Sequence, residues 1–207
     1  MELPLFAELL SRHLETIVEL SPSQISALHA HFELLWKWNQ RMNLTSLRSP
    51  AEIITRHYSE SIFFGLHLPA AAGGIAILDL GSGAGFPGVP MAVLRPEWHV
   101  TLVESHQRKA VFLRESTRGV HNISIVARRA ESVEGRFDWL VARAVRLVDV
   151  LSQVPRLSSN VGLLIGEGDS AELRSRSAIE WSDPIRVPWG ERRVCVYGSV
   201  SRGTQQD

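Results

Sequence analysis

The chain has 207 residues, of which 44% are hydrophobic, so it can bury a full core, and we expect one compact unit. The charges of its 22 basic and 22 acidic residues cancel, so the protein as a whole does not attract nucleic acid electrostatically. A polyanion would have to bind at a local basic patch. The single cysteine, Cys195, excludes an internal disulfide, and the acidic start MELPLFAELLSRH is unlike a secretory signal. A proline and two glycines interrupt the uncharged run 61–78, so we expect no membrane span and a cytoplasmic protein.

The first third of the chain has the pattern of helices. Ser21-Pro22-Ser23-Gln24 supplies an N-cap, a proline at the first helical position and a glutamine that can close a capping box. Apolar residues then recur at near-helical spacing, which predicts a helix ending around WKWNQRMN, residues 36–43. Ser49-Pro50-Ala51-Glu52 repeats the start signal and predicts a second helix through 53–64. We expect residues 1–70 to form a helical extension packed on the core.

From residue 71 to 207 the pattern alternates between short apolar, β-rich runs and helices. The predicted strands are 75–80, 98–104, 123–127, 137–144, 161–166 and 193–199. The helical pattern at 107–117 stops at Gly119. This alternation predicts a doubly wound, Rossmann-like α/β fold with a mostly parallel sheet, followed by a polar tail, 201–207, that frays.

The first predicted strand leads into a glycine-rich turn in IAILDLGSGAGFPGVP, residues 75–90. Open α/β sheets bind ligands at such a strand-to-helix turn. Gly81, Gly83 and Gly85 allow a tight turn and a close approach to a ligand, and the helix beginning near Gly88 offers unpaired amides. Gly83, Gly85 and Gly88 also match the dinucleotide pattern G-x-G-x-x-G, so two kinds of cofactor compete for this turn.

Two prolines and one carboxylate favour S-adenosylmethionine over a dinucleotide. Pro87 and Pro90 have no backbone N–H, so the helix start is short of donors for a pyrophosphate. Asp79 ends the first strand, where it is placed to meet a cationic amine, and S-adenosylmethionine carries an ammonium and a sulfonium but no phosphate. Glu104 ends the second strand and could accept from both ribose hydroxyls, a feature that dinucleotide sites share.

Whole phrases of the chain are more specific than the turn alone. They are LWKWNQRMNLTS, ITRHYSESI, ILDLGSGAGFPGVPMAVLRPE, TLVESHQRKAVFLRE, FDWLVARAV and WGERRVCV. Together they resemble the bacterial 16S ribosomal RNA guanine-N7 methyltransferase family, RsmG, formerly called glucose-inhibited division protein B. The resemblance implies a class I S-adenosylmethionine-dependent methyltransferase whose target is a guanine in the 530 loop of 16S RNA. We expect the partner to be 16S rRNA or a small ribosomal subunit precursor, and the protein to be a monomer.

The resemblance also assigns residues. It implies that the cofactor pocket uses Gly81 and Phe86 from the turn, Ala130 and Glu131 after the third strand, and Arg143 at the end of the fourth. The basic residues that match family positions, and that we expect to bind RNA, are Arg129, Arg143 and Arg192, with Arg128, Arg146 and Arg193 beside them.

The chain departs from the family at two places. Glu60 stands where the family has aspartate, and Ile165-Gly166 stands where the family has Lys-Gly. We expect the first change to affect only a structural contact. The second removes a cation from the cleft, so we expect Ile165→Lys to raise RNA affinity, provided that burial does not neutralise the new lysine.

The chemistry is consistent with a guanine N7 target. Methylation of a pyrimidine at C5 needs a cysteine nucleophile, and Cys195 lies in the last strand, away from the ligand end. Methylation of an exocyclic amine commonly uses a polar-Pro-Pro-aromatic turn, but this chain has Arg143-Ala144-Val145 there. Guanine N7 carries an in-plane lone pair that needs no general base, so we name no catalytic acid or base. N7 is reachable mainly in RNA loops, because the major groove of an RNA helix is deep and narrow.

The remaining candidates are less specific. Trp36 and Trp38 are two apart on a helix and point to different sides, so we expect at least one of them in the core. We expect Arg56-His57 to brace the N-terminal helices against the sheet. We expect no metal site, because no pair of histidines has metal-ligand spacing on a plausible helix face. A small-molecule methyltransferase, a dinucleotide-dependent oxidoreductase and a non-catalytic cofactor-binding protein remain as alternatives.

Overall fold

The structure is a computed structural model that describes residues 1–70, 73–176 and 179–200; the tail 201–207, expected to fray, lies outside them. Among the described residues an eight-stranded sheet has the order β3-β2-β1-β4-β5-β8-β6, with β7 paired to β8. The strands are β1 (Ala76–Leu80), β2 (His99–Val103), β3 (Ile123–Val126), β4 (Trp139–Arg143), β5 (Asn160–Gly166), β6 (Ile179–Trp181), β7 (Ile185–Arg186) and β8 (Arg193–Val200).

Strands β1 to β5 pair in parallel, and β8 returns antiparallel between β5 and β6. The mostly parallel sheet predicted from the sequence is therefore confirmed, and each of the six predicted strands is present. The strand order reverses between β1 and β4, and ligands of open α/β sheets bind at the carboxyl ends of the strands beside such a reversal.

Helices precede the sheet and connect its strands. The segments before the sheet are α1 (Leu3–Leu14), α2 (Pro22–Met42), α3 (Pro50–Ile53), the π-helix η1 (Ile54–Ser59) and α4 (Glu60–His67). The later segments are α5 (Gly88–Leu94), α6 (Gln107–Ser116), the 3-10 helix η2 (Ala130–Ser132), α7 (Leu147–Leu151), α8 (Val154–Leu157) and α9 (Glu167–Arg176). The predicted capping box of α2 is present, because Ser21 Oγ accepts from the Gln24 N–H and Gln24 Oε1 accepts from the Ser21 N–H.

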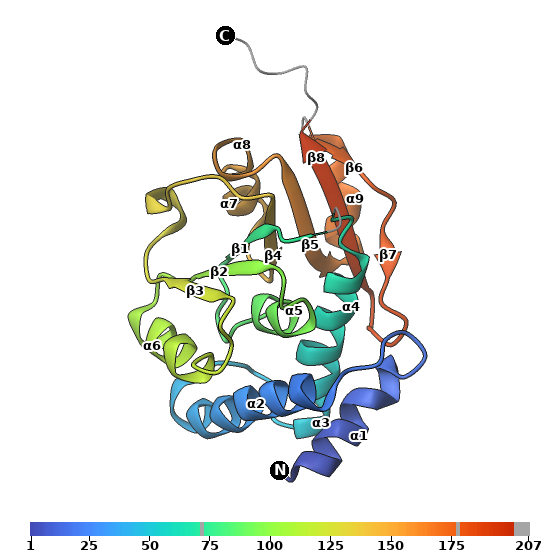
Figure 1. The fold of residues 1–207 in the computed structure, drawn as a ribbon. Coiled ribbons are helices and arrows are strands. Elements are labelled where there is room, and N and C mark those ends of the chain that lie inside the picture. Colours follow the sequence, from blue (N-terminus) through green and yellow to red (C-terminus); the bar gives the residue numbers. More distant parts are fainter. Residues whose placement is uncertain (71–72, 177–178, 201–207) are drawn as a thin grey trace.

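Two apolar clusters cover the two faces of the sheet. The smaller cluster joins β1, β4 and β5 to α7, α8 and α9. The larger one joins the other face to α1 through α6, and it contains Phe6 of α1, Tyr58 of η1 and Tyr197 of β8. Figure 1 shows the N-terminal helices gathered at one end of the molecule, with α2 running beside α5 and α6. The N-terminal helices thus share one continuous core with the sheet.

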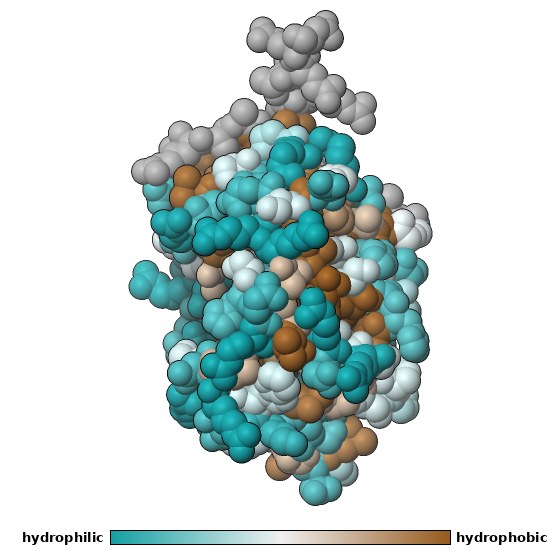
Figure 2. Space-filling view, turned by 90° about the vertical axis from the view of Figure 1, so that its left-hand side faces the viewer, coloured by the Kyte–Doolittle hydropathy of each residue, from teal (hydrophilic) through white to brown (hydrophobic). Residues whose placement is uncertain are grey.

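The surface follows from this packing. Figure 2 shows a largely hydrophilic face with an apolar patch near its middle. The most exposed large apolar side chain among the described residues is Val148 of α7, at 67%. In the same residues, no helix combines the length and the apolar character that crossing a membrane requires.

Candidate active site

The glycine turn follows β1 at the carboxyl edge of the sheet. Gly81, Gly83 and Gly85 have φ angles of 72°, 58° and 93°, which a side chain would strain. A Cβ on Gly81 or Gly85 would also meet a valine side chain, at 2.7 and 2.6 Å. At Gly83 the nearest atom would be the Gly81 carbonyl oxygen at 3.8 Å. Gly83 is therefore the glycine of the three whose Cα faces open space, where a ligand can approach.

The helix after the turn has few free donors. The Gly88 N–H donates to Asp79 Oδ2 at 3.0 Å, and the Val89 N–H donates to the Gly85 carbonyl at 2.7 Å. Pro87 and the proline that follows Val89 have no N–H to offer. Phosphate sites at helix starts depend on free amides, so this turn is unsuited to a pyrophosphate.

Asp79 lies beneath the turn and is fully buried. Its Oδ2 accepts from Gly88, while Oδ1 has no hydrogen-bond partner. Burial raises the pKa of Asp79 to about 7, and the hydrogen bond from Gly88 opposes that rise. We expected this carboxylate to meet a cationic amine directly, but the structure places it behind the turn, where it supports the backbone.

Glu104 follows β2 and contacts the backbone of Gly83. Its Oε2 accepts from the Gly83 N–H at 3.1 Å and its Oε1 accepts from the His106 N–H at 2.7 Å. The side chain is 7% exposed. Each carboxylate oxygen has a further lone pair, so Glu104 can still accept from a ligand hydroxyl beside the glycine turn.

Phe86 connects the turn to the N-terminal helices. Its ring stacks on His57 with 4.8 Å between centroids and meets His31 and Tyr58 edge to face. Only 7% of Phe86 is exposed. The ring is therefore fixed in the core, and it holds η1 against the turn.

Ala130 and Glu131 lie on η2, after β3, and an arginine that the sequence did not single out binds the backbone at both ends of this segment. Arg156 of α8 donates from Nη2 to the Ala130 carbonyl at 2.7 Å and from Nη1 to the Val133 carbonyl. Glu131 itself is exposed. Arg156 also donates to Gln153 Oε1 at 2.7 Å, but no motif marks its role here, because the two carbonyls that it contacts on this segment are more than twenty residues away.

Arg143 ends β4 and is held in a buried ion pair. Its Nη2 donates to Glu60 Oε2 at 3.2 Å, and its Nη1 donates to His57 Nδ1 at 2.9 Å. The side chains of Arg143 and Glu60 are 9% and 1% exposed. Burial lowers the pKa of Arg143 to about 10, which leaves the guanidinium charged at neutral pH. Burial raises the pKa of Glu60, and the Arg143 charge opposes that rise.

The network continues into the N-terminal helices through His57. Burial, with the adjacent Arg143 charge, lowers the pKa of His57 to about 3, so the imidazole is neutral. Since Nδ1 accepts from Arg143, Nε2 carries the proton and donates to Thr45 Oγ1 at 2.7 Å. The Thr45 N–H donates in turn to Asn39 Oδ1 at 2.9 Å. His57 does brace the helices against the sheet, and it does so through the arginine of the site.

The basic residues are spread along the same edge. Arg193 begins β8 at the same edge of the sheet, and its charge contributes to lowering the pKa of His57 and opposes the rise in the pKa of Glu60. Arg192 is exposed, has a φ of 56°, and accepts the Glu167 N–H at its carbonyl. Arg129 follows β3, three strand spacings or roughly 14 Å from β4. These arginines cannot all contact one phosphate, so they fit an extended polyanion.

Ile165 does not line this edge. Its side chain is 6% exposed and belongs to the smaller apolar cluster, on the face of the sheet opposite to Arg143. A lysine there would bury its ammonium among apolar side chains, where the charged form is disfavoured. Our expectation that Ile165→Lys restores a cleft cation is therefore wrong for this fold.

The described residues hold no group of three or more histidine, cysteine, aspartate or glutamate side chains able to bind a metal ion. The residues that the structure brings to one edge are those of the turn, Glu104, η2 and Arg143.

Solved structures share this fold. The chain superposes on the magnesium protoporphyrin IX methyltransferase from Synechocystis PCC 6803 with a TM-score of 0.61 at 10% identity, covering 83% of this chain and 97% of that one. It superposes on fibrillarin from Aeropyrum pernix with a TM-score of 0.53 at 19% identity, covering 68% and 73%. Both were solved with S-adenosylmethionine bound. At these identities the likeness shows a Rossmann-like methyltransferase fold.

Sequence comparisons are more specific. The model of the GidB family, rRNA small subunit methyltransferase G, matches residues 24–178. The ribosomal RNA small subunit methyltransferase G of Nitrosomonas europaea is 43% identical over 155 residues, 71% of each chain. That of an Enterobacter species is 34% identical over 201 residues, 90% of this chain and 95% of its own. The phrases along the chain and these matches agree: the chain belongs to the rRNA small subunit methyltransferase G family.

Proposed function

We propose that this protein transfers a methyl group from S-adenosylmethionine to N7 of a guanine in the 530 loop of 16S ribosomal RNA. Family membership carries the class of reaction, methylation of small-subunit ribosomal RNA. The observation that supports the cofactor is the start of α5, where prolines and engaged amides leave no donors for a pyrophosphate.

The residues at the edge fit S-adenosylmethionine. Gly83 offers an open Cα face, and Glu104 beside it would accept from the ribose hydroxyls. Ala130 and Glu131 follow the next strand and would line the adenosine end. When bound, S-adenosylmethionine supplies an electrophilic methyl group.

No protein base is needed for this transfer, because guanine N7 attacks with a lone pair and carries no proton. His57 is unsuited to act as a base, since Arg143 occupies its Nδ1 and its Nε2 proton is directed to Thr45. Burial raises the pKa of Cys195 to about 12, so this thiol is unsuited to act as a nucleophile. The rate then depends on how well the protein holds N7 in line with the methyl group and the sulfur atom that it leaves.

RNA is held by local charge in this neutral chain. Arg129, Arg192 and Arg193 would contact phosphates, while the buried Arg143 orients the base or the cofactor. The protein would act as a monomer, in the cytoplasm, on 16S RNA or on a small-subunit precursor.

The test is to map N7-methylguanine in 16S RNA from cells with and without this gene. We expect one methylated guanine in the 530 loop to be lost with the gene; unchanged modification overturns the assignment. Thermal-shift titration separates the other classes. Stabilisation by NAD alone would indicate an oxidoreductase, and stabilisation by S-adenosylmethionine without methyl transfer to RNA would indicate a small-molecule enzyme or a non-catalytic protein.

A further inference from the structure

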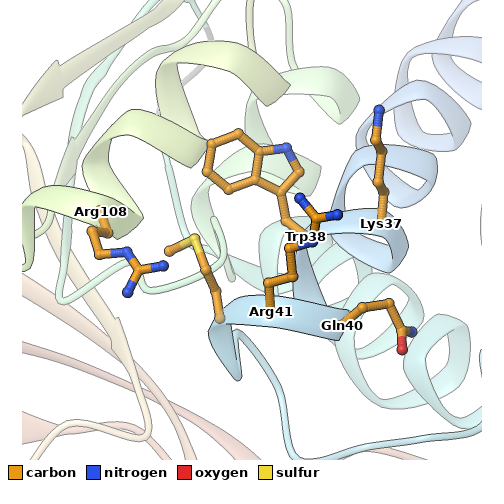
Figure 3. A pocket seen from close by; sticks show the side chains of 6 residues that line it. Lys37, Trp38, Gln40, Arg41 and Arg108 are labelled. Carbon is orange, nitrogen blue, oxygen red and sulfur yellow. The ribbon is translucent and has the colours of Figure 1, made fainter.

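A pocket of about 440 Å³ lies between the last two turns of α2 and the first turn of α6, apart from the glycine turn. Figure 3 shows side chains of α2 and Arg108 of α6 around it. Its lining residues are Lys37, Trp38, Gln40, Arg41, Met42 and Arg108.

The pocket is basic and carries no counter-charge. Lys37, Arg41 and Arg108 are all exposed, and none of them forms an ion pair or a side-chain hydrogen bond with another described residue. No carboxylate lines the pocket. In a chain whose charges cancel overall, three uncompensated cations around one hollow favour an anionic ligand.

Trp38 gives the pocket an aromatic wall. The ring is half-buried and packs at 60° against Phe112, with 5.7 Å between centroids. Trp36 differs, because it stacks on Phe32 within the helical core. A ring anchored on one side and open to a hollow on the other is the arrangement on which nucleic-acid bases stack.

The pocket borders the cofactor site through α6. Glu104 accepts from the N–H of His106, which caps the helix that begins at Gln107 and carries Arg108 in its first turn. Glu104 of the cofactor site and Arg108 of the pocket therefore lie on one short segment of the chain, 104–108.

We propose that the pocket binds a single-stranded nucleotide of the RNA substrate that flanks the target guanine, with its base on Trp38 and its phosphates against Lys37, Arg41 and Arg108. The proposal rests on the proposed function, because it needs RNA as the substrate. It adds a second contact, formed by the N-terminal helices, that fixes which guanine reaches the methyl donor.

The first test changes charge alone. Arg41→Gln/Arg108→Gln removes two pocket cations, and Arg12→Gln/Arg118→Gln removes two exposed cations from α1 and from the segment after α6. The probe is a 16S fragment that contains the 530 loop, titrated at several salt concentrations. We expect the pocket variant to lower the slope of log K against log salt by about 1.4, since each single-strand phosphate contact contributes about 0.7. The control should keep the wild-type slope.

The second test changes the ring. Trp38→Leu should weaken RNA binding about tenfold, a typical effect of losing one stacked base, and Trp38→Phe should recover part of it. S-adenosylmethionine affinity and Tm are measured alongside, because Trp38 also touches Phe112. Should Trp38→Leu fail to fold, the charge variants still decide the question.

The outcomes separate this proposal from the proposed function. If the wild-type protein neither binds nor methylates 16S RNA, both are overturned. If it does both and the two charge variants behave alike, the pocket proposal alone is overturned. Weaker binding to assembled small subunits but not to naked RNA would assign the pocket to a protein partner and would also overturn it.

Discussion

Gly83→Ala is the sharpest test of the cofactor site, because at Gly83 backbone strain can be separated from ligand contact. The φ of 58° costs alanine roughly 1–2 kcal/mol, and the new methyl group meets no protein atom closer than 3.8 Å. For a chain of this length, that strain corresponds to a Tm lower by roughly 2–8 °C. The protein should therefore fold.

Binding should change much more than folding. The methyl group would occupy the open space beside Glu104, so we expect the Kd for S-adenosylmethionine to rise at least tenfold, or about 1.4 kcal/mol. Gly73→Ala is the matched control, since Gly73 has a φ of 113°, also has free space around its Cβ position, and precedes the amino end of β1. Calorimetric titration of both variants measures the Kd. A wild-type Kd for Gly83→Ala would show that the cofactor lies elsewhere.

Three further experiments test the site. Glu104→Gln keeps the size of the side chain and removes its charge and half of its hydroxyl-accepting capacity, so calorimetry should show weaker S-adenosylmethionine binding at unchanged Tm; an unaltered Kd would leave Glu104 with a structural role only. Since the pKa of Asp79 is raised to about 7 in the folded state, its contribution to stability is fully present below the unfolded pKa of 3.8 and is lost as pH rises through 7. Urea unfolding should therefore show the wild type losing stability relative to Asp79→Asn between pH 4 and pH 8, and a difference independent of pH would contradict this. Arg192→Ala and Arg193→Gln should each reduce RNA binding and methyl transfer with little change in Tm; indifference of both across a salt titration would place the RNA patch elsewhere.

The sequence predicts the sheet well because its strands are continuous apolar runs. β1 and β4 are buried on both faces, so nearly all of their residues are apolar, and such a short apolar run predicts a strand without knowledge of the pairing partners. Among the described residues, β6 and β7 have three and two residues and pair only with β8, and runs this short carry no pattern. Their positions depend on tertiary pairing.

Some features of the candidate site are likewise predictable from the sequence and others are not. The glycines are predictable, because only glycine accepts their φ angles without strain. The burial of Asp79 is not predictable from the sequence, since an aspartate at this position has the same sequence context whether it faces a ligand or supports a turn. Arg143 contacts Glu60, which is 83 residues away in the sequence, and it is connected to Thr45 through His57. No local sequence pattern can predict contacts between residues so far apart.

The continuous core on the N-terminal side of the sheet has a consequence for how the chain is made. Phe64 accepts from the Tyr197 hydroxyl at 2.6 Å, across 133 residues, in the cluster that also holds Phe6. During synthesis the first helices leave the ribosome long before β8 exists to complete that cluster. Domains generally fold as units, and distant contacts form late because loop closure must precede them. The N-terminal helices can pack against η1, α5 and α6 as soon as residue 116 has been made, but the cluster is complete only when almost the whole chain has been translated.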